Sequence, residues 1–460
     1  MQLAFLFACG LLLTGFVLRY NLRVLARLYI PASVVGGLIG LAIAQNSTYT
    51  GYGHAILAPI LTSYRATWTT WLVAVVFAGM LLERPGGSAR RNLRETAQQG
   101  IAAWIIILGQ LVLGLTVAWL ILGPAFGVPV HLGQVLEVTW AGGFGSAAGW
   151  GAVHEGIGVF PEAKDVALFG ATCGMLFGVL SGIVLVNLAV RRGWTQANKA
   201  ESTSFNLDPS SLGPQPAAMT RVPREIIDPM AFQALLLAAA FAAGWGMQQG
   251  VAWLASLGEA MSFVSQLSNL PLFLFTLLGG WVVRALLQAI GAAHLIDTLS
   301  MHRLTGAAMD FLIVAALTSL RLEAVVELLW PMLLLMAVGA AWCVVNLVWL
   351  SPKLLPRTYW FELGVINFGF ATATTAQGMM LLRMIDPDLR TDAAKTYAMG
   401  APLTAPFIGG GVISFLLPKV IEDVNVSWII AIGVVAVVAL YAVGRRVAAG
   451  SPVSVVEQEA

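Results

Sequence analysis

Side chains that could bind a polar ligand are concentrated in two stretches of the chain, 138–156 and 363–382. Both stretches are apolar overall but are interrupted by small, hydroxyl and amide residues. Glycine lets the backbone approach a ligand closely, and hydroxyl or amide groups can bind a substrate or an ion. The candidate binding residues are Gly142, Gly143, Gly145 and Ser146 in the first stretch and Asn367, Gly369, Thr372, Thr374, Thr375 and Gln377 in the second. Close helix packing is the alternative role for the glycines.

Asp310 is an acidic residue inside the apolar segment 305–321. A carboxylate in the middle of a membrane costs at least about 2.5–3.5 kcal/mol on insertion scales, so such a residue usually has a function. Asp310 could coordinate a sodium ion or carry a proton. The alternative is that its side chain reaches the membrane surface, because it lies only one or two turns from the start of the segment.

Motifs for enzymatic chemistry are weak in this sequence. The dipeptide Gly-Lys never occurs, which argues against a nucleotide-driven motor. His154-Glu155 lacks the second histidine of a zinc protease helix, and no two histidines have the spacing of a metal site. Ser146 has no candidate histidine base in another apolar segment, so a serine protease is also disfavoured. We therefore predict a protein that is not an enzyme and needs no cofactor.

The composition is that of a polytopic membrane protein. Hydrophobic residues make up 58% of the 460 residues and charged residues 10%, whereas soluble domains have about 45–50% and about 25%. This excludes a soluble enzyme, and the scattered basic residues predict no nucleic-acid partner. Apolar segments long enough to span a membrane predict eleven helices. They cover residues 3–19, 29–45, 66–82, 99–122, 166–190, 230–257, 263–290, 305–321, 324–350, 398–418 and 427–444.

The stretches 138–156 and 363–382 contain too many polar residues to be ordinary spans, and we predict that each forms a re-entrant hairpin. A hairpin that ends inside the membrane leaves backbone N–H and C=O groups in need of partners. A polar substrate and its ions can supply them. Helix N-termini near the hairpin tip attract carboxylate groups, and backbone carbonyls attract sodium.

The distribution of Lys and Arg predicts the orientation of the chain. With the N-terminus outside, all but four of the 25 basic residues fall on the cytoplasmic side, as the positive-inside rule requires. The four exceptions are Arg65, Lys164, Arg321 and Lys419. We therefore expect an external N-terminus and a cytoplasmic C-terminus.

The two halves of the chain contain the same features in the same order. The matched features are the segments 77–83 and 317–323, the pairs Gly36-Gly37 and Gly279-Gly280, Glu137 and Glu362 before the hairpins, the hairpins themselves, and Gly170-Ala171 and Gly400-Ala401 after them. Each repeat has five spans, an odd number, so the repeats are expected to have inverted topology, as in secondary transporters. The predicted domains are a first repeat at 1–190, a cytoplasmic linker at 191–229, a second repeat at 230–421, and an extra span with the C-terminal tail at 422–460.

Three motifs resemble those of the bacterial sodium/glutamate symporter family. Residues 30–38, Ile-Pro-Ala-Ser-Val-Val-Gly-Gly-Leu, are similar to the family pattern Ile-Pro-x-Pro-Val-x-Gly-Gly-Leu. Residues 141–150, Ala-Gly-Gly-Phe-Gly-Ser-Ala-Ala-Gly-Trp, resemble its Ser-Gly-Gly-His-Gly-Thr-Gly-Ala-Ala-Trp. Residues 369–376, Gly-Phe-Ala-Thr-Ala-Thr-Thr-Ala, resemble its Gly-Phe-Gly-Leu-Gly-Ala-Thr-Pro-Thr-Ala. With the order of the spans, the resemblance covers most of residues 25–420.

The resemblance implies sodium-driven uptake of glutamate across the bacterial inner membrane, with the two hairpins meeting near the middle of the bilayer. It implies that the hairpin glycines, Ser146 and the threonines at 372, 374 and 375 bind the ligands. The chain differs from the family pattern at Phe144, where the family has histidine, at Ala371 and Ala373, where it has glycine, and at Thr374, where it has proline. The span 427–444 is an addition.

From these observations we predict a secondary transporter that couples sodium to the import of glutamate or a similar anionic amino acid. The alternative is transport of another small organic anion, driven by sodium or protons. A channel or a membrane scaffold would not need two opposed polar hairpins. The expected partners are the small anion, sodium and the lipid bilayer, and a homodimer is compatible with the sequence.

Overall fold

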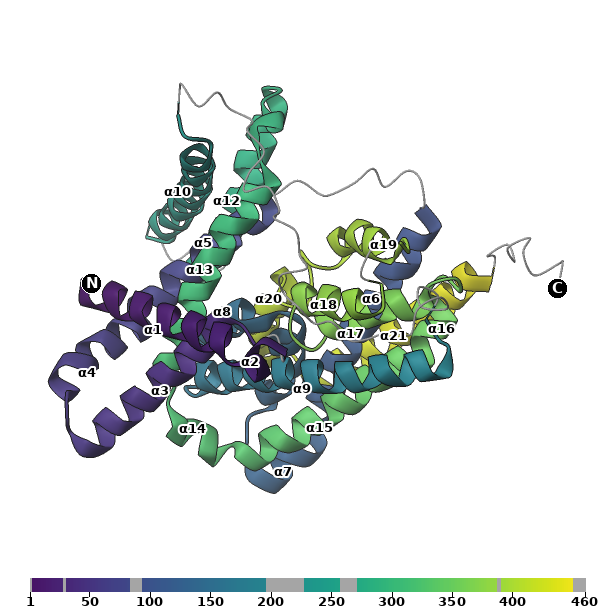
Figure 1. Ribbon diagram of the computed structural model, residues 1–460, viewed down its shortest axis with the longest axis horizontal. Coiled ribbons are helices and arrows are strands. Elements are labelled where there is room, and N and C mark those ends of the chain that lie inside the picture. The colour runs from purple at the N-terminus through teal and green to yellow at the C-terminus, as the bar shows by residue number, and fades with distance from the viewer. Residues whose placement is uncertain are drawn as a thin grey trace. The chain divides into compact units, whose positions relative to one another are not determined.

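The computed structural model describes residues 2–27, 30–82, 93–195, 227–256, 271–386 and 390–449 (Figure 1). Of the described residues 86% are helical, and no strand occurs among them. This agrees with the predicted all-α class. Most of the predicted linker 191–229 lies outside the described residues.

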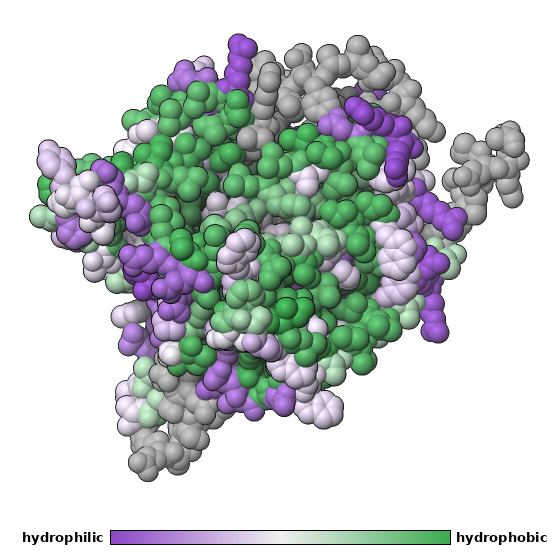
Figure 2. Space-filling view, turned by 90° about the horizontal axis from the view of Figure 1, so that it is seen from below, coloured by the Kyte–Doolittle hydropathy of each residue, from purple (hydrophilic) through white to green (hydrophobic). Residues whose placement is uncertain are grey.

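Eight described helices are long and apolar enough to cross a membrane. They are Gln2–Asn21, His54–Leu82, Leu93–Phe126, Ala163–Arg192, Pro229–Ala255, Leu272–Ala289, Leu329–Leu354 and Val426–Ala449. Apolar side chains also dominate the face of the molecule seen in Figure 2. Large exposed side chains such as Trp245, Trp281, Trp330 and Trp428 suit a lipid environment. The chain is therefore a multi-pass membrane protein.

Two further predicted spans are helices of more polar composition. The segment 29–45 lies mostly in α3 (Ala32–Thr50), and the segment 305–321 lies mostly in α13 (Thr298–Thr318). Helix α13 begins seven residues earlier than the apolar pattern indicates, because Asp297 caps it by accepting a hydrogen bond from the backbone N–H of Ser300. Asp310 therefore lies near the middle of its helix, about 18 Å along the axis from Thr298.

The predicted span 398–418 is not one continuous helix. The chain forms α19 (Ala393–Gly400) and the short 3-10 helix η9 (Ala401–Leu403), then an irregular segment, and only then α20 (Val412–Asp423). Proline cannot continue a helix, and Gly409 and Gly410 have φ angles of +72° and +85°. We refer to residues 404–411 as the break. The apolar composition of residues 398–418 predicted one continuous helix and did not indicate this interruption.

The chain forms two compact units, and each unit contains segments from both halves of the sequence. Unit 1 comprises residues 1–84, 144–168 and 206–326, and unit 2 comprises 85–143, 169–205 and 327–460. The boundaries at 143/144 and 168/169 place most of α8 (Gly143–Ile157) and the start of α9 (Ala163–Arg192) in unit 1.

Unit 1 contains helices that are paired in an equivalent way in the two halves. Its helices are α1 (Gln2–Asn21), α2 (Arg23–Arg27), α3, α4 (His54–Ser63), η1 (Tyr64–Trp68), α5 (Thr69–Leu82), α8, α10 (Pro229–Ala255), α12 (Leu272–Ala289), η7 (Ala293–Leu295), α13 and α14 (Leu322–Glu327). Helix α3 packs against α1 and α13, whereas α12 packs against α10 and α5. Helices α5 and α13 also pack together. Each of α1, α3 and α5 therefore has a counterpart with equivalent neighbours, namely α10, α12 and α13.

Glycines allow the closest of these helix contacts. A Cβ atom added at Gly36 of α3 would collide with the carbonyl oxygen of Leu11 in α1. In the same way, a Cβ atom at Gly279 of α12 would collide with the carbonyl oxygen of Ala240 in α10. The repeated Gly-Gly pairs in the sequence therefore serve the same packing purpose in both halves.

Unit 2 is arranged around α6 (Leu93–Val117). Its other elements are η2 (Ala118–Leu122), α7 (Gly123–Phe126), η3 (Val130–Gln134), η4 (Leu136–Ala141), most of α9, α15 (Leu329–Val345), η8 (Asn346–Leu350), α16 (Ser351–Leu354), α17 (Trp360–Phe370), α18 (Thr375–Ile385), α19, η9, α20 and α21 (Val426–Ala449). Helix α6 packs against α21, α15, α19, η3 and η4. Most residues of α6 are buried, including two glutamines, Gln99 and Gln110.

Candidate functional site

The second predicted hairpin folds as two helices joined by a short turn. Helix α17 ends at Phe370 and α18 begins at Thr375. The backbone N–H of Ala371 donates to the carbonyl of Asn367 at 2.8 Å, and the side chain of Thr374 caps α18 by accepting from the N–H of Gln377 at 3.3 Å. The helices pack together closely, since a Cβ atom on Gly369 would collide with the backbone of Gly378. This stretch is therefore a pair of packed helices joined by a turn, and its re-entry into a membrane stays a prediction.

Polar side chains near this turn are held by hydrogen bonds. Thr372, which is buried, donates to the carbonyl of Phe368 at 2.9 Å and accepts from the Gln377 amide at 3.3 Å. Thr374 and Thr375 are exposed at the tip, where the Thr375 hydroxyl lies 2.9 Å from that of Tyr397 on α19. The turn therefore combines a fixed polar interior with two accessible hydroxyl groups.

Two glutamines of α6 support this hairpin. The side-chain amides of Gln99 and Asn367, both buried, form two reciprocal hydrogen bonds of 2.6 and 2.9 Å. Gln110 donates to the carbonyl oxygen of Ala371 in the turn at 2.7 Å. Neither glutamine was among the predicted site residues. The sequence could have indicated both glutamines, because they are polar residues within the apolar segment 99–122. The same criterion identified Asp310.

The first predicted hairpin has its change of direction at Gly142 and Gly143. The π-helix η4 ends at Ala141 and α8 begins at Gly143, which has a φ angle of +69°. Residues other than glycine adopt this left-handed backbone conformation at a cost of about 1–2 kcal/mol. The sequence therefore needs a glycine at position 143 for the backbone to turn here.

The structure brings Gly143 next to the turn of the second hairpin within unit 2. A Cβ atom on Gly143 would lie 3.1 Å from the carbonyl oxygen of Ala373 and 3.6 Å from Cγ2 of Thr374. Helix α9 adjoins the same turn, because Cβ atoms at Gly174 and Gly178 would collide with the backbone and side chain of Thr372. The Gly142-Gly143 bend and the 371–374 turn therefore form one cluster of irregular backbone with exposed hydroxyl groups beside it.

The remaining predicted residues belong to unit 1. Ser146 is buried on α8, and a Cβ atom on Gly145 would lie 2.8 Å from Cε of Met309, the neighbour of Asp310. The Asp310 side chain is exposed on α13. The structure thus places Gly145 and Ser146 in the same unit as Asp310, with Gly145 beside Met309, and it groups the candidates of unit 2 around its two turns.

Three of the four basic residues that the orientation rule left outside lie together around Asp165. Arg321 Nε lies 2.8 Å from one Asp165 oxygen, and the Arg321 backbone N–H donates to the other at 2.8 Å. Arg65 lies 3.9 Å from the same carboxylate. Lys164 is buried and donates to Thr69 Oγ1 at 2.7 Å and to the carbonyl of Arg65 at 2.8 Å. The hydrogen bond that the Arg321 side chain donates to Asp165 raises the pKa of Arg321, which lies between α13 and α14.

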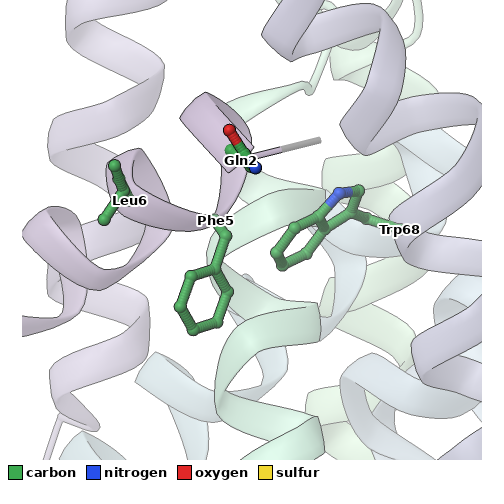
Figure 3. A pocket seen from close by; sticks show the side chains of 4 residues that line it. All are labelled: Gln2, Phe5, Leu6 and Trp68. Carbon is green, nitrogen blue, oxygen red and sulfur yellow. The ribbon is translucent and has the colours of Figure 1, made fainter.

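Other features of the described chain do not form a binding site for an anion. A shallow pocket near the N-terminus is lined by Gln2, Phe5, Leu6 and Trp68 and is almost entirely apolar (Figure 3). No group of three or more His, Cys, Asp or Glu side chains that could hold a metal ion occurs in the described ranges. The two turns of unit 2 remain the best candidates.

Comparison with known proteins identifies one protein family. A model of the sodium/glutamate symporter family matches residues 1–383, which include the bend at Gly142-Gly143 and the turn between α17 and α18. No curated protein and no solved structure matches the chain. Because the family model covers most of the chain, with motifs at the positions of both turns, the protein belongs to the sodium/glutamate symporter family.

Proposed function

We propose that the protein is a secondary active transporter that imports glutamate or a similar anionic amino acid together with sodium. Membership of the symporter family supports transport of a small molecule with sodium. The observation that carries the proposal is the contact between the bend at Gly143 and the turn at Ala373. It brings together two interruptions of helix from distant parts of the chain, which is the type of site that transporters use for polar substrates.

The two turns offer complementary chemistry. Helix α18 begins at the tip with exposed Thr374 and Thr375, so its positive dipole end and two hydroxyl groups can receive a carboxylate. The carbonyl oxygens of the turn, such as that of Ala373 beside Gly143, can coordinate a sodium ion. We place substrate and sodium binding at Gly142, Gly143, Thr372, Thr374, Thr375 and Gln377, with Gly145, Ser146, Asn367 and Gly369 shaping the hairpins.

Inverted repeats are part of this proposal. The equivalent pairing of α1, α3 and α5 with α10, α12 and α13 supports a repeat relation, since each helix has a counterpart with the same neighbours. An odd number of spans in each repeat would give the repeats opposite orientation. The hairpins 138–156 and 363–382 would then enter the membrane from opposite sides.

The inverted arrangement predicts that the linker and the C-terminus are cytoplasmic in a bacterial inner membrane. The cysteine variants Phe205→Cys and Val455→Cys should be protected from an impermeant thiol reagent in intact cells and should react after the cells are opened. The unmodified chain, which has Cys9, Cys173 and Cys343, is the control. Reaction of either variant in intact cells would contradict the inverted repeats.

Uptake by the purified protein in proteoliposomes tests the function directly. We expect labelled glutamate to accumulate when a sodium gradient is imposed, and not when potassium replaces sodium. Aspartate and other small dicarboxylates should be supplied as competitors. Accumulation that follows a pH gradient without sodium, or competition only by an organic anion without an amino group, would favour the second candidate. Phe144, Ala371 and Ala373 in place of the family residues are the observation that keeps this candidate open.

A further inference from the structure

Glu137 is a fully buried carboxyl group that the proposed substrate site does not use. It lies on η4, six residues before Gly143, and 0% of its surface is exposed. Its Oε1 atom accepts a hydrogen bond from the backbone N–H of Gly409 at 2.6 Å and another from the Ser414 hydroxyl at 2.5 Å. Its Oε2 atom is also buried and has no hydrogen-bond partner in the described chain. One oxygen is therefore well satisfied and the other is not.

The charge of this carboxyl group is not balanced by a basic residue. No Lys, Arg or His side chain of the described residues forms an ion pair with Glu137. An ionised carboxylate that is buried without a partner is very costly, whereas a neutral carboxylic acid needs only its hydrogen bonds. The surroundings of Glu137 therefore require one additional positive charge at Oε2.

A proton meets this requirement better than a metal ion. The groups around Glu137 are hydrogen-bond donors, namely the backbone N–H groups of Gly409 and Gly410, the Ser414 hydroxyl and the Gln134 side chain. The N–H of Gly409 and the Ser414 hydroxyl can donate to Oε1 as the carbonyl oxygen of a carboxylic acid. A sodium ion would need several oxygen atoms around it, but a proton needs only a covalent bond to Oε2.

One partner of Glu137, Gly409, lies in the break, and the other, Ser414, lies in the first turn of α20. Gly409 and Gly410 have positive φ angles, and the N–H of Gly410 donates to the Ser414 hydroxyl at 3.1 Å. Gln134 also binds the start of α20, because its side-chain amide donates to the carbonyl oxygen of Ser414 at 2.5 Å. Glu137 thus ties the segment before the Gly143 bend to a segment without regular helix. The break lies beyond residue 383, where the family match ends.

We propose that Glu137 is a proton-binding site, in which a proton from the aqueous phase forms an O–H bond with Oε2 and stabilises the break in the conformation described. Release of the proton breaks that O–H bond and leaves a buried negative charge, which favours a rearrangement of residues 404–411. The site uses other residues than the proposed substrate site, and it does not depend on the identity of the transported anion.

Other titratable groups lie on the elements around η4, and their titration must be distinguished from that of Glu137. They are Arg94, Glu95, His131, Cys173, Cys343, Lys419, Glu422 and Asp423, on α6, η3, α9, α15 and α20. Two of them pair with each other, since His131 Nε2 lies 3.3 Å from Glu422. The Cys343 thiol accepts a hydrogen bond from Gln110 at 3.4 Å. The measurement must therefore detect a protonated carboxyl group specifically.

Infrared spectroscopy of the purified full-length protein provides that measurement. We expect the C=O stretching band of a protonated carboxyl group at neutral pH, and we expect it to disappear as the pH is raised. Glu137→Gln should remove this band, because the amide replaces the acid while keeping an acceptor for Gly409 and Ser414. Asp310→Asn and His131→Gln should retain it. Exchange of sodium for potassium at constant pH should leave the band unchanged.

A second variant tests the assignment without altering Glu137. Ser414→Ala removes one of the two hydrogen bonds to Oε1, so the band should shift to higher frequency while remaining present. The absence of a protonated band in the wild type at neutral pH would overturn the proposal. Removal of the band by sodium at constant pH would also overturn it and would assign a metal cation to Oε2. Neither result depends on whether the protein transports glutamate.

Discussion

The stretches 138–156 and 363–382 were predicted to be equivalent hairpins, but their turns have different structures. In the second stretch, α17 and α18 pack on each other within unit 2, with Gly369 against Gly378. In the first stretch, η4 belongs to unit 2, whereas α8 from Phe144 onward belongs to unit 1. The second turn is therefore stabilised by its own two helices. The first turn has a glycine with a positive φ angle at position 143, and the elements on its two sides belong to different units.

Gly369→Val should have the largest effect, because the second hairpin depends on its own packing. The added side chain would collide with the backbone of Gly378, so the two helices would have to separate. We expect loss of labelled-substrate uptake in proteoliposomes and a lower melting temperature. Gly246→Val is the matched control, since nothing lies within 4 Å of a Cβ atom there. Normal uptake by Gly369→Val would show that the close packing of α17 and α18 has no functional role.

Gly143→Val should abolish uptake with a smaller loss of stability. The substitution forces a β-branched residue into a positive φ angle and places its Cβ atom 3.1 Å from the Ala373 carbonyl. Gly143→Ala has the same Cβ contact and a backbone cost of about 1–2 kcal/mol but lacks the two γ-methyl groups of valine, so it should be intermediate. Uptake and membrane insertion should be measured for both variants. Equal effects of alanine and valine would mean that the γ-methyl groups of valine add no further clash with the second turn.

Asn367→Ala and Gln99→Ala should each weaken the support of the second hairpin. Either change leaves a buried amide without its partner, at a cost of about 1–3 kcal/mol. The double variant should cost less than the sum of the two, because both partners are then absent. Thermal unfolding of the two single variants and of the double variant gives the coupling. Additive effects would contradict the pairing seen at 2.6 and 2.9 Å.

Thr375→Ala should affect ligand binding at the second turn more than it affects stability. The residue is exposed, and its only described side-chain hydrogen bond is to Tyr397. We expect a raised Michaelis constant for substrate or sodium with a nearly unchanged yield of protein. Tyr397→Phe, which removes the same hydrogen bond from the other side, separates the two roles. If both variants have the same Michaelis constants as the wild type, the exposed hydroxyl is not a ligand.

Asp310→Asn should have the smallest and most selective effect, since this residue belongs to unit 1. If Asp310 binds sodium, the sodium dependence of uptake should shift to higher concentration by roughly fivefold or more, with little change in substrate affinity at saturating sodium. If Asp310 carries a proton, the variant should lose pH dependence and keep its sodium response. Unchanged responses to both ions would assign Asp310 to an interfacial role.

Much of the site could be located from the sequence because local composition carried the signal. Glycines within apolar stretches indicated both turns, and the capping role of Thr374 follows from its position just before α18. The break at 404–411 also had a local signal in Pro406 and three successive glycines, but the high overall hydropathy of 398–418 outweighed it. Gln99 and Gln110 could have been found from their position in an apolar span. Their partners could not, because those lie more than 200 residues away.

The sequence by itself determined that this is a helical membrane protein, where most of its helices run, and which family it belongs to. These properties depend on composition, on apolar segments and on short motifs, which are local in the chain. Only the tertiary structure decided which helices form each unit, that Gly143 adjoins Ala373, and that Glu137 meets Ser414. The reason is that many of the helices have similar patterns of apolar residues, so the pattern does not specify which helices pack together. Their partners are selected by close fit at glycines and by hydrogen bonds between buried polar groups, which no single segment contains.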